Sequence, residues 1–164
     1  MLQPKIVVIQ GANLAALGTR QPHLYGKQTL QQIHSDLQQR FGQQCNLEFV
    51  CSNHEGVLLD AIHKYGSSAQ GFVINAGAYT HTSYALADAL AAVQLPCIEV
   101  HLTNVARREP FRQHSCIAPV CLGSICGLGA MGYTWAVEAM LQHLQCCSTA
   151  QSSNRESNRA GSAI

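Results

Sequence analysis

Residues 5–10 read KIVVIQ, and the unbroken aliphatic run from Ile6 to Ile9 decides the fold of this chain. The run is apolar at odd and even positions alike, which is typical of a strand covered on both faces in a parallel sheet. Further runs of the same kind predict the remaining strands, and they cover residues 46–51, 71–75, 97–101 and, more weakly, 120–125. The sequence therefore predicts a five-stranded parallel sheet.

Helical patterns lie between these strands. Thr29-Leu30-Gln31-Gln32 is a capping box, and apolar residues follow it at helical spacing through Phe41. Other helices are predicted over residues 55–64, 82–93 and 129–144. Strands alternating with helices predict an α/β fold, a doubly wound sandwich of three layers.

Composition argues against several classes of protein. The chain has 164 residues and 47% hydrophobic content, which is enough for one domain with a buried core. Its net charge of +1 provides no basic surface for nucleic acid or anionic lipid. The first apolar run is too short for a signal peptide, and no apolar segment approaches the roughly 20 residues that cross a bilayer. We expect a soluble cytoplasmic protein with neither nucleic acid nor membrane as a partner.

The cysteines and the polar end of the chain complete this outline. None of the eight cysteines has the C-x-x-C spacing of a zinc site, and several lie in apolar runs, so we expect reduced, buried thiols and no metal. Residues 148–164 are rich in Ser, Asn, Ala and Arg without an apolar period. We therefore expect a domain of residues 1–147 and a disordered tail over 148–164.

A ligand site is expected where the strands end. In open α/β sheets the ligand binds at the carboxyl ends of the strands, and polar residues follow the predicted strands here. The connection from residue 11 to residue 28 is long for its place in the fold and carries Arg20 and Tyr25. Its length favours a lid that closes on the substrate and excludes water.

Several long blocks resemble one enzyme family. GANLAALGTRQPHLYG at residues 11–26 resembles the lid signature of the type II 3-dehydroquinate dehydratases, also called type II dehydroquinases. The other blocks match in the same order: SNHEG at 52–56, INAGAYTHTS at 74–83, IEVHLTNV at 98–105 and REPFR at 108–112. The resemblance covers the chain from about residue 5 to residue 144 and implies a flavodoxin-like fold.

The resemblance implies a reaction and its catalytic residues. The family dehydrates 3-dehydroquinate to 3-dehydroshikimate in the shikimate pathway of aromatic amino-acid biosynthesis, through an enolate and without metal or other cofactor. By resemblance, Tyr25 is the base, Arg20 and Arg108 stabilise its anion, and His101 is the acid. A tyrosine ordinarily has a pKa of about 10, so a tyrosinate near neutral pH requires roughly 4 kcal/mol from such cations. The remaining assignments are Asn13, which holds a water against the enolate oxygen, and Glu99, which orients His101.

The resemblance also implies the residues that bind the substrate and the assembly. The expected substrate-binding residues are Asn75, His81, Leu102, Thr103 and Arg112. Asp88 is expected to reach the site of a neighbouring subunit, because the family assembles trimers into a dodecamer.

Some features depart from this interpretation or compete with it. Gln10, Ala12 and Ala15 replace the commoner Asn, Pro and Asn, Thr103 replaces Ser, and Ala106-Arg107 replaces His-Ala. Residues 127–132 read GLGAMG, but no strand or acidic residue follows to complete a dinucleotide site, so we assign these glycines to close helix packing. The alternatives are a non-catalytic flavodoxin-like module for a mononucleotide or polyol, and an enzyme acting on a related cyclic polyol acid. The sequence leaves open whether the enzyme serves shikimate biosynthesis or quinate breakdown.

Overall fold

The strands form a single parallel sheet. The computed structural model describes residues 3–160, with side chains through residue 149. The sheet has the spatial order β2-β1-β3-β4-β5, and all neighbouring strands are parallel. This order is that of flavodoxin-like folds, so the predicted fold class is confirmed. The strands are β1 (Lys5–Gln10), β2 (Asn46–Cys51), β3 (Gly71–Asn75), β4 (Cys97–His101) and β5 (Gly123–Cys126).

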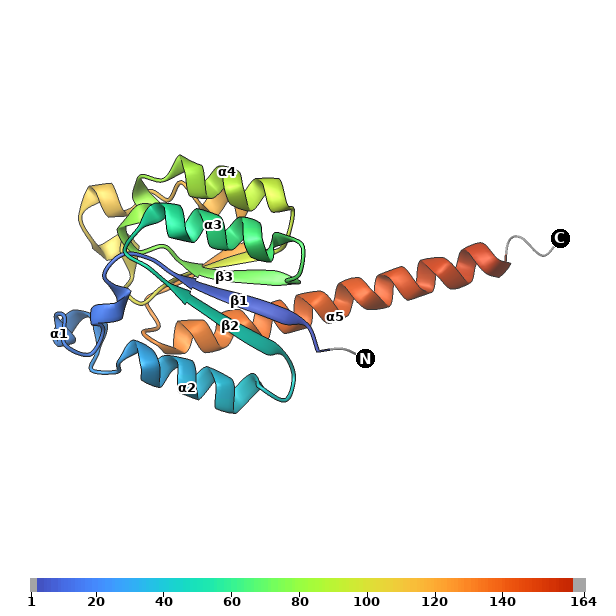
Figure 1. Ribbon diagram of the computed structural model, residues 1–164, viewed down its shortest axis with the longest axis horizontal. Helices are drawn as coiled ribbons and strands as arrows, with labels where there is room; N and C mark the ends of the chain where they lie inside the picture. The colour runs from blue at the N-terminus through green and yellow to red at the C-terminus, as the bar shows by residue number, and fades with distance from the viewer. Residues whose placement is uncertain (1–2, 161–164) are drawn as a thin grey trace.

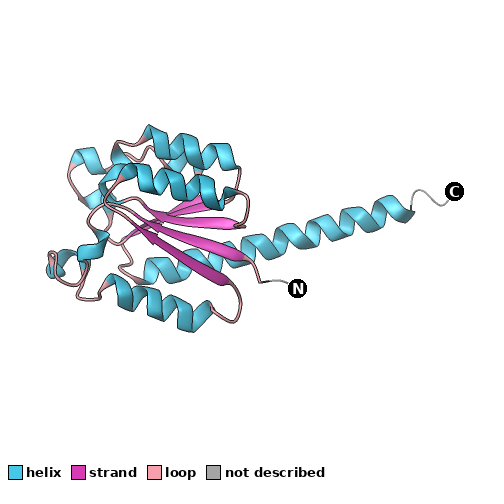
Figure 2. Cartoon of the chain, in the orientation of Figure 1, coloured by secondary structure: helices cyan, strands magenta, loops and turns pink. Residues whose placement is uncertain are grey.

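Helices cover both faces of the sheet. Figure 2 shows the strands as the middle of three layers, and Figure 1 shows α3 and α4 on one face with α2 and the first part of α5 on the other. The helices are α1 (Pro22–Tyr25), α2 (Leu30–Phe41), α3 (Glu55–Gly66), α4 (Tyr84–Val93) and α5 (Met131–Ala160). The loops at the carboxyl ends of the strands also contain several 3-10 turns.

Strand β1 shows why the predicted strands are apolar at both parities. Ile6 and Val8 belong to the core cluster beneath α2 and α5, whereas Val7 and Ile9 belong to the cluster beneath α3 and α4. All four side chains are fully buried. Alternate residues of a strand point to opposite faces, so a strand between two helical layers needs an apolar residue at every position.

Hydrogen-bonding side chains fix the beginnings of α2 and α4. The Thr29 hydroxyl accepts from the Gln32 amide, and the Gln32 side chain accepts from the Thr29 amide, so the predicted capping box is confirmed. Helix α4 begins at Tyr84, two residues later than predicted. The reason is that the Ser83 hydroxyl caps it by accepting from the Leu86 amide at 3.0 Å.

The predicted lid is a folded segment between β1 and α2. It contains a 3-10 turn over Leu14–Ala16 and the short helix α1. Its first residue is held close to β3, because the Gly11 amide donates to the Asn75 carbonyl at 2.8 Å. A Cβ at Gly11 would lie 2.1 Å from the Ala76 carbonyl oxygen, so only glycine fits here. Closure of this segment over a ligand stays a prediction.

The glycines of residues 127–132 connect β5 to α5 and support the end of β4. The Gly127 amide donates to the His101 carbonyl at 3.1 Å, and the Gly129 amide donates to the Leu102 carbonyl at 2.9 Å. A Cβ at Gly132 would lie 3.3 Å from the Val100 side chain. This tight approach of α5 to the sheet agrees with the packing role that we assign to these glycines.

Helix α5 continues without a break through Cys147 as far as Ala160, so the backbone of residues 148–160 is helical. The division into a domain of residues 1–147 and a disordered tail over 148–164 stays a prediction. Figure 1 shows the second half of α5 projecting beyond the sheet. Extending an existing helix avoids the cost of nucleation, which allows a helical backbone in a segment without an apolar period. Residues 161–164 lie outside the described residues.

The cysteines differ in part from the expected pattern. All eight are free thiols, but only Cys45, Cys97 and Cys116 are buried. Cys51, Cys146 and Cys147 are exposed, so the expectation of burial is wrong for these three. Cys146 and Cys147 follow Leu141 and Leu144, the last residues of α5 that pack in or against the core among the described residues. Across the described chain, no helix is both long enough and apolar enough to span a membrane.

Candidate active site

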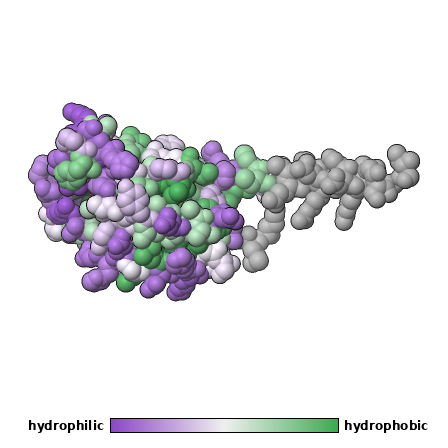
Figure 3. Space-filling model, turned by 90° about the horizontal axis from the view of Figure 1, so that it is seen from above, coloured by the Kyte–Doolittle hydropathy of each residue, from purple (hydrophilic) through white to green (hydrophobic). Residues whose placement is uncertain are grey.

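A cavity of about 230 Å³ lies at the carboxyl ends of β1, β3 and β4. Figure 3 shows mostly hydrophilic side chains at this end of the molecule. Most of the predicted site residues line the cavity: Asn13, Arg20, Tyr25, Asn75, His81, His101, Leu102, Thr103, Arg108 and Arg112. Sequence reasoning missed the small and apolar residues that complete the wall: Ala12, Leu14, Gly77, Ala78 and Val105.

Tyr25 lies beside two guanidinium groups. The central carbon of the Arg20 guanidinium is 5.3 Å from the centre of the Tyr25 ring, and that of Arg108 is 5.8 Å away. Arg108 Nη1 also donates to the Tyr25 hydroxyl at 3.4 Å. This hydrogen bond raises the pKa of Arg108 above its ordinary value. The Tyr25 phenol therefore lies within direct reach of two guanidinium groups at the cavity.

Side chains from one loop hold Arg108 in place. Its Nη1 donates to the Thr103 hydroxyl at 3.2 Å, and its Nε donates to Glu109 Oε2 at 3.3 Å. Arg112 Nε donates to the same carboxylate oxygen at 3.0 Å. Glu109 therefore holds two of the cavity arginines side by side. The Thr103 hydroxyl accepts a hydrogen bond from Arg108, and a serine at this position would keep that acceptor.

His101 contacts a buried carboxylate behind the cavity wall. Its Nε2 lies 3.1 Å from Glu99 Oε1, and the Glu99 side chain is only 1% exposed. The two residues lie on the same face of β4, as their spacing predicts. Because a carboxylate has no hydrogen to donate, Nε2 carries the hydrogen of this contact. Glu99 thus orients the imidazole without lining the cavity.

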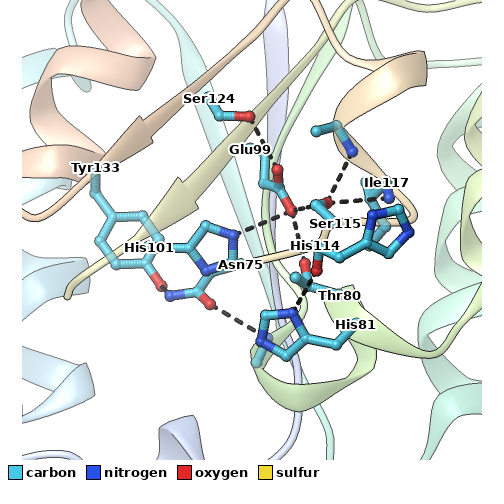
Figure 4. Close-up of polar contacts among 12 residues, drawn as sticks. Asn75, Thr80, His81, Glu99, His101, His114, Ser115, Ile117, Ser124 and Tyr133 are labelled. Atoms are coloured by element: carbon cyan, nitrogen blue, oxygen red, sulfur yellow. Dashed lines mark hydrogen bonds and ion pairs between the residues drawn. The ribbon is translucent and has the colours of Figure 1, made fainter. Parts of the chain in front are cut away.

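Three hydroxyl groups that sequence reasoning missed also bind Glu99 (Figure 4). Oε1 accepts from Thr80 at 2.6 Å and from Ser115 at 2.8 Å, and Oε2 accepts from Ser124 at 2.9 Å. Burial by itself would raise the pKa of the Glu99 carboxyl, but the hydrogen bonds from His101, Thr80 and Ser115 together lower it to about 2. Glu99 is therefore ionised at neutral pH.

His81 is held by the backbone of a neighbouring loop. Its Nδ1 donates to the carbonyl of His114 at 2.7 Å. Its ring lies nearly parallel to that of His101, with the centres 6.4 Å apart, and the edge of Phe111 packs against it. Nδ1 is bound to this carbonyl, so Nε2 is the ring nitrogen left for other partners.

Asn75 joins the cavity to a buried polar network. Its Nδ2 donates to the hydroxyl of Tyr133 at 3.0 Å, and its Oδ1 accepts from the Gly77 amide at 3.2 Å. Tyr133 is fully buried, and burial raises its pKa to about 12 although the polar side chains of Gln10 and Asn75 oppose this rise. Gln10, one of the departures from the family pattern, is also bound through Oε1 to His34 Nε2 at 2.7 Å. Tyr133 had no sequence signal beyond its place in an apolar helix face.

Asn13 lies at a turn with a left-handed backbone. Its φ is 67°, a conformation that asparagine tolerates better than most residues. Its amide donates to the Asn53 side chain at 2.8 Å, which ties the start of the lid segment to the loop after β2. Gly77, with a φ of 63°, lies against the same turn, and a Cβ there would lie 2.7 Å from the Ala12 carbonyl oxygen. The backbone thus shapes this wall of the cavity.

Asp88 is the predicted site residue that lies elsewhere. It is exposed on α4 and does not line the cavity. The prediction assigns it to the site of a neighbouring subunit. Among the described residues, no three His, Cys, Asp or Glu side chains are arranged to hold a metal ion.

Comparisons with known proteins agree on one family. A model of the family described as "Dehydroquinase class II" matches residues 4–141. A 3-dehydroquinate dehydratase of Ruegeria pomeroyi is 53% identical over 141 residues, covering 85% of this chain and 94% of the relative. One of Acaryochloris marina is 49% identical over 146 residues, covering 88% and 98%. The crystal structure of a type II dehydroquinase from Butyrivibrio crossotus is 41% identical, with a TM-score of 0.82 over 84% of this chain and 97% of that one.

Proposed function

The chain belongs to the class II dehydroquinase family, and from this we propose that it is a hydro-lyase that converts 3-dehydroquinate to 3-dehydroshikimate in the shikimate pathway. The observation that supports the mechanism is that one cavity holds a tyrosine beside two cations and a histidine beside an anion. Tyr25 lies beside Arg20 and Arg108, and His101 lies on Glu99. A base stabilised as an anion and an acid supported by an anion are the two groups that an elimination of water requires.

The first step is removal of a proton next to the ketone by Tyr25. As a tyrosinate, its oxygen accepts this proton, and the two guanidinium groups stabilise the charge before the transfer. Arginine suits this role because it does not lose its own proton to the base. The electrons of the broken C–H bond move to the ketone oxygen and give an enolate. Asn13, through a bound water, and neighbouring backbone amides stabilise that oxygen.

The second step expels the hydroxyl group. The enolate re-forms the ketone, the new carbon–carbon double bond forms, and the carbon–oxygen bond to the hydroxyl breaks. His101 donates a proton to the departing oxygen, so that water leaves. Glu99 stabilises the protonated imidazole beforehand, and its contact with Nε2 leaves Nδ1 as the ring nitrogen turned away from the carboxylate.

The other cavity residues bind the substrate. Arg112 suits the carboxylate of the substrate, because a guanidinium offers two parallel donors to such a group. Asn75 and His81 supply hydrogen bonds to its hydroxyl groups, and Leu102 and Thr103 supply backbone and hydroxyl contacts. The cavity of about 230 Å³ is of a size for one small ring.

Assembly and location also belong to this proposal. We infer a dodecamer of trimers in which Asp88 reaches a neighbouring site, and its exposure on α4 is compatible with that role. The free thiols of the eight cysteines support a cytoplasmic location.

The test is turnover of 3-dehydroquinate, followed by the enone absorbance of the product. We expect Tyr25→Phe and His101→Ala each to lower kcat by about two to four orders of magnitude while the protein stays folded. His23→Ala, which changes an exposed histidine on α1, is the matched control and should retain wild-type activity. Near-normal turnover in Tyr25→Phe would contradict the base assignment. Absence of turnover in the wild type would favour a non-catalytic binding module.

A further inference from the structure

The hydroxyl of Ser115 uses all of its hydrogen-bonding capacity. Its oxygen accepts from the amides of Ile117 at 3.1 Å and Ala118 at 2.9 Å, and its hydrogen is directed to Glu99 Oε1 at 2.8 Å. A hydroxyl has one hydrogen and two lone pairs. With both lone pairs occupied by amides, Ser115 is able only to donate to Glu99 (Figure 4).

This arrangement reserves Glu99 Oε1 as an acceptor. A proton on that oxygen would face the hydrogen of the Ser115 hydroxyl. The hydroxyl oxygen has no lone pair left to accept such a proton, because both accept from backbone amides. The fully buried Thr80 donates to the same oxygen at 2.6 Å. The proton shared by Glu99 and His101 is therefore kept on the imidazole, and the charge of the carboxylate is divided among several donors.

The same loop segment also holds the second histidine of the cavity. The carbonyl of His114 accepts from His81 Nδ1, and the next residue, Ser115, donates to the carboxylate that holds His101 Nε2. Two consecutive residues thus determine which nitrogen of each ring carries a hydrogen. Glu99, His114 and Ser115 do not line the cavity themselves, so their effect on a ligand passes through the two imidazoles, which do.

We propose that Ser115 is a positioning residue of the reaction. Its hydroxyl keeps the proton of the Glu99–His101 pair on the His101 imidazole, and it keeps the imidazole able to give that proton to the substrate. The inference rests on the proposed function, since it gives His101 the part of the acid. Thr80, in the 3-10 turn that follows β3, donates to the same carboxylate oxygen. Ser124 supports Oε2 from the edge strand β5, where Ser124 is itself exposed to solvent.

The sign of the effect follows from the charge of the hydroxyl hydrogen. Removing this partial positive charge makes the surroundings of the pair more negative, so the pair binds its proton more tightly. In Ser115→Ala the alkaline limb of the pH profile of kcat should move to higher pH by about one unit, which is what one hydrogen bond to a charged group is worth. The acid gives up its proton less readily, and kcat should fall roughly tenfold with KM changed by less than about twofold.

The conservative and matched variants separate positioning from general stability. Ser115→Thr keeps the hydroxyl and should restore the wild-type profile. Thr80→Val removes the second donor to Oε1 at nearly constant volume, and it should shift the limb in the same direction even if Ser115→Ala fails to fold. Ser83→Ala removes another buried serine that caps α4 and does not contact Glu99. It should lower the melting temperature and leave the limb in place.

The decisive outcomes are distinct. A limb that moves upward in both Ser115→Ala and Thr80→Val, with rescue in Ser115→Thr, supports the inference. A kcat that is lowered by the same factor at every pH, or an equal shift in Ser83→Ala, overturns it. Nitrogen-15 spectra of labelled histidine, assigned with His101→Asn, should show the hydrogen on Nε2 of His101 in the wild type. This readout needs no turnover, so an inactive wild type would refute the proposed function and leave the positioning of His101 separately testable.

Discussion

On the proposed mechanism, replacing Arg108 with glutamine measures how much one cation stabilises the anionic form of Tyr25. Arg108 Nη1 lies 3.4 Å from the Tyr25 hydroxyl oxygen. Opposite unit charges at that distance interact by roughly 5 kcal/mol at an effective dielectric constant of about 20. The Arg108 side chain is 15% exposed, and solvent and salt reduce this value. Arg20 remains beside the ring, so we expect a loss of about 2–3 kcal/mol in stabilisation of the anion.

This loss predicts a rate that depends strongly on pH. A difference of about 1.4 kcal/mol is tenfold in an equilibrium constant, so the fraction of tyrosinate at neutral pH should fall roughly 30- to 150-fold. The value of kcat/KM should fall by the same factor. Raising the pH restores the tyrosinate, and the deficit of Arg108→Gln should shrink about tenfold with each pH unit until the two proteins converge.

The assay is the initial rate of enone formation from 3-dehydroquinate, measured from neutral to alkaline pH. Arg107→Gln is the matched control, because Arg107 is the preceding residue, is exposed and does not line the cavity. It should stay within about twofold of the wild type, as surface charges usually do. A deficit in Arg108→Gln that is equal at every pH would refute the reasoning, since it would assign Arg108 to substrate binding in place of activation of the base.

Other changes test the buried groups and the end of the chain. Glu99→Gln removes the anion beside His101, so the alkaline limb of the pH profile of kcat should move to lower pH. The melting temperature of this variant should also fall less than that of the wild type when the pH is lowered from about 4.3 to 2. A carboxyl with a pKa of about 2 when folded stabilises the fold above its ordinary value of about 4.3, and this contribution, of order 3 kcal/mol, disappears as the pH falls from about 4.3 to 2. Tyr133→Phe leaves the Asn75 amide without its buried acceptor, so the free energy of unfolding in urea should fall by about 1–3 kcal/mol and KM should rise more than kcat falls. Deletion of residues 148–164 should leave kcat and the melting temperature unchanged, and a loss of either would show that the outer part of α5 takes part in folding or assembly.

The fold could be predicted from the sequence because its strands lie between two helical layers. Ile6 to Ile9 are apolar at every position, and each parity contacts a different cluster. The same logic predicts β2, β3 and β4. It is weakest for β5, an edge strand whose first residues are exposed, and only part of the predicted run over 120–125 is strand. The other edge strand, β2, has six residues and was predicted with its observed bounds, whereas β5 has only four residues and none of them is fully buried, so too few apolar positions mark it in the sequence.

The cavity residues were predictable for a different reason. Tyr25 and His101 were assigned by their place in ordered blocks of sequence, and the sheet brings those blocks to one edge. Ser115 and Ser124 had no such signal, because a serine has no periodic pattern and their contacts with Glu99 depend on how distant loops pack. The sequence does indicate that Glu99 needs hydrogen-bond donors. A glutamate inside an apolar strand must find hydrogen-bond donors when it is buried.

The two halves of the site differ in how their charges are supported, and this difference predicts where substitutions act. Glu99 lies in the middle of β4 and is almost wholly buried. Its hydrogen-bond donors lie on the turn after β3, on the loop between β4 and β5, and on β5 itself. The carboxylate that supports the proposed acid, His101, is therefore fixed before a ligand binds. Tyr25 and Arg20 lie on the long connection after β1, and Arg108 lies on a loop tied to an exposed carboxylate, so the base end depends on how two loops meet. On the proposed mechanism, substitutions that displace Arg20 or Arg108 in those loops act on proton removal through the position of the cations, whereas substitution of the exposed Arg107 does not. Substitutions of the residues that donate to Glu99 act on proton donation by His101. The loop substitutions should therefore move the acidic limb of the pH profile of kcat, and the substitutions around Glu99 should move its alkaline limb.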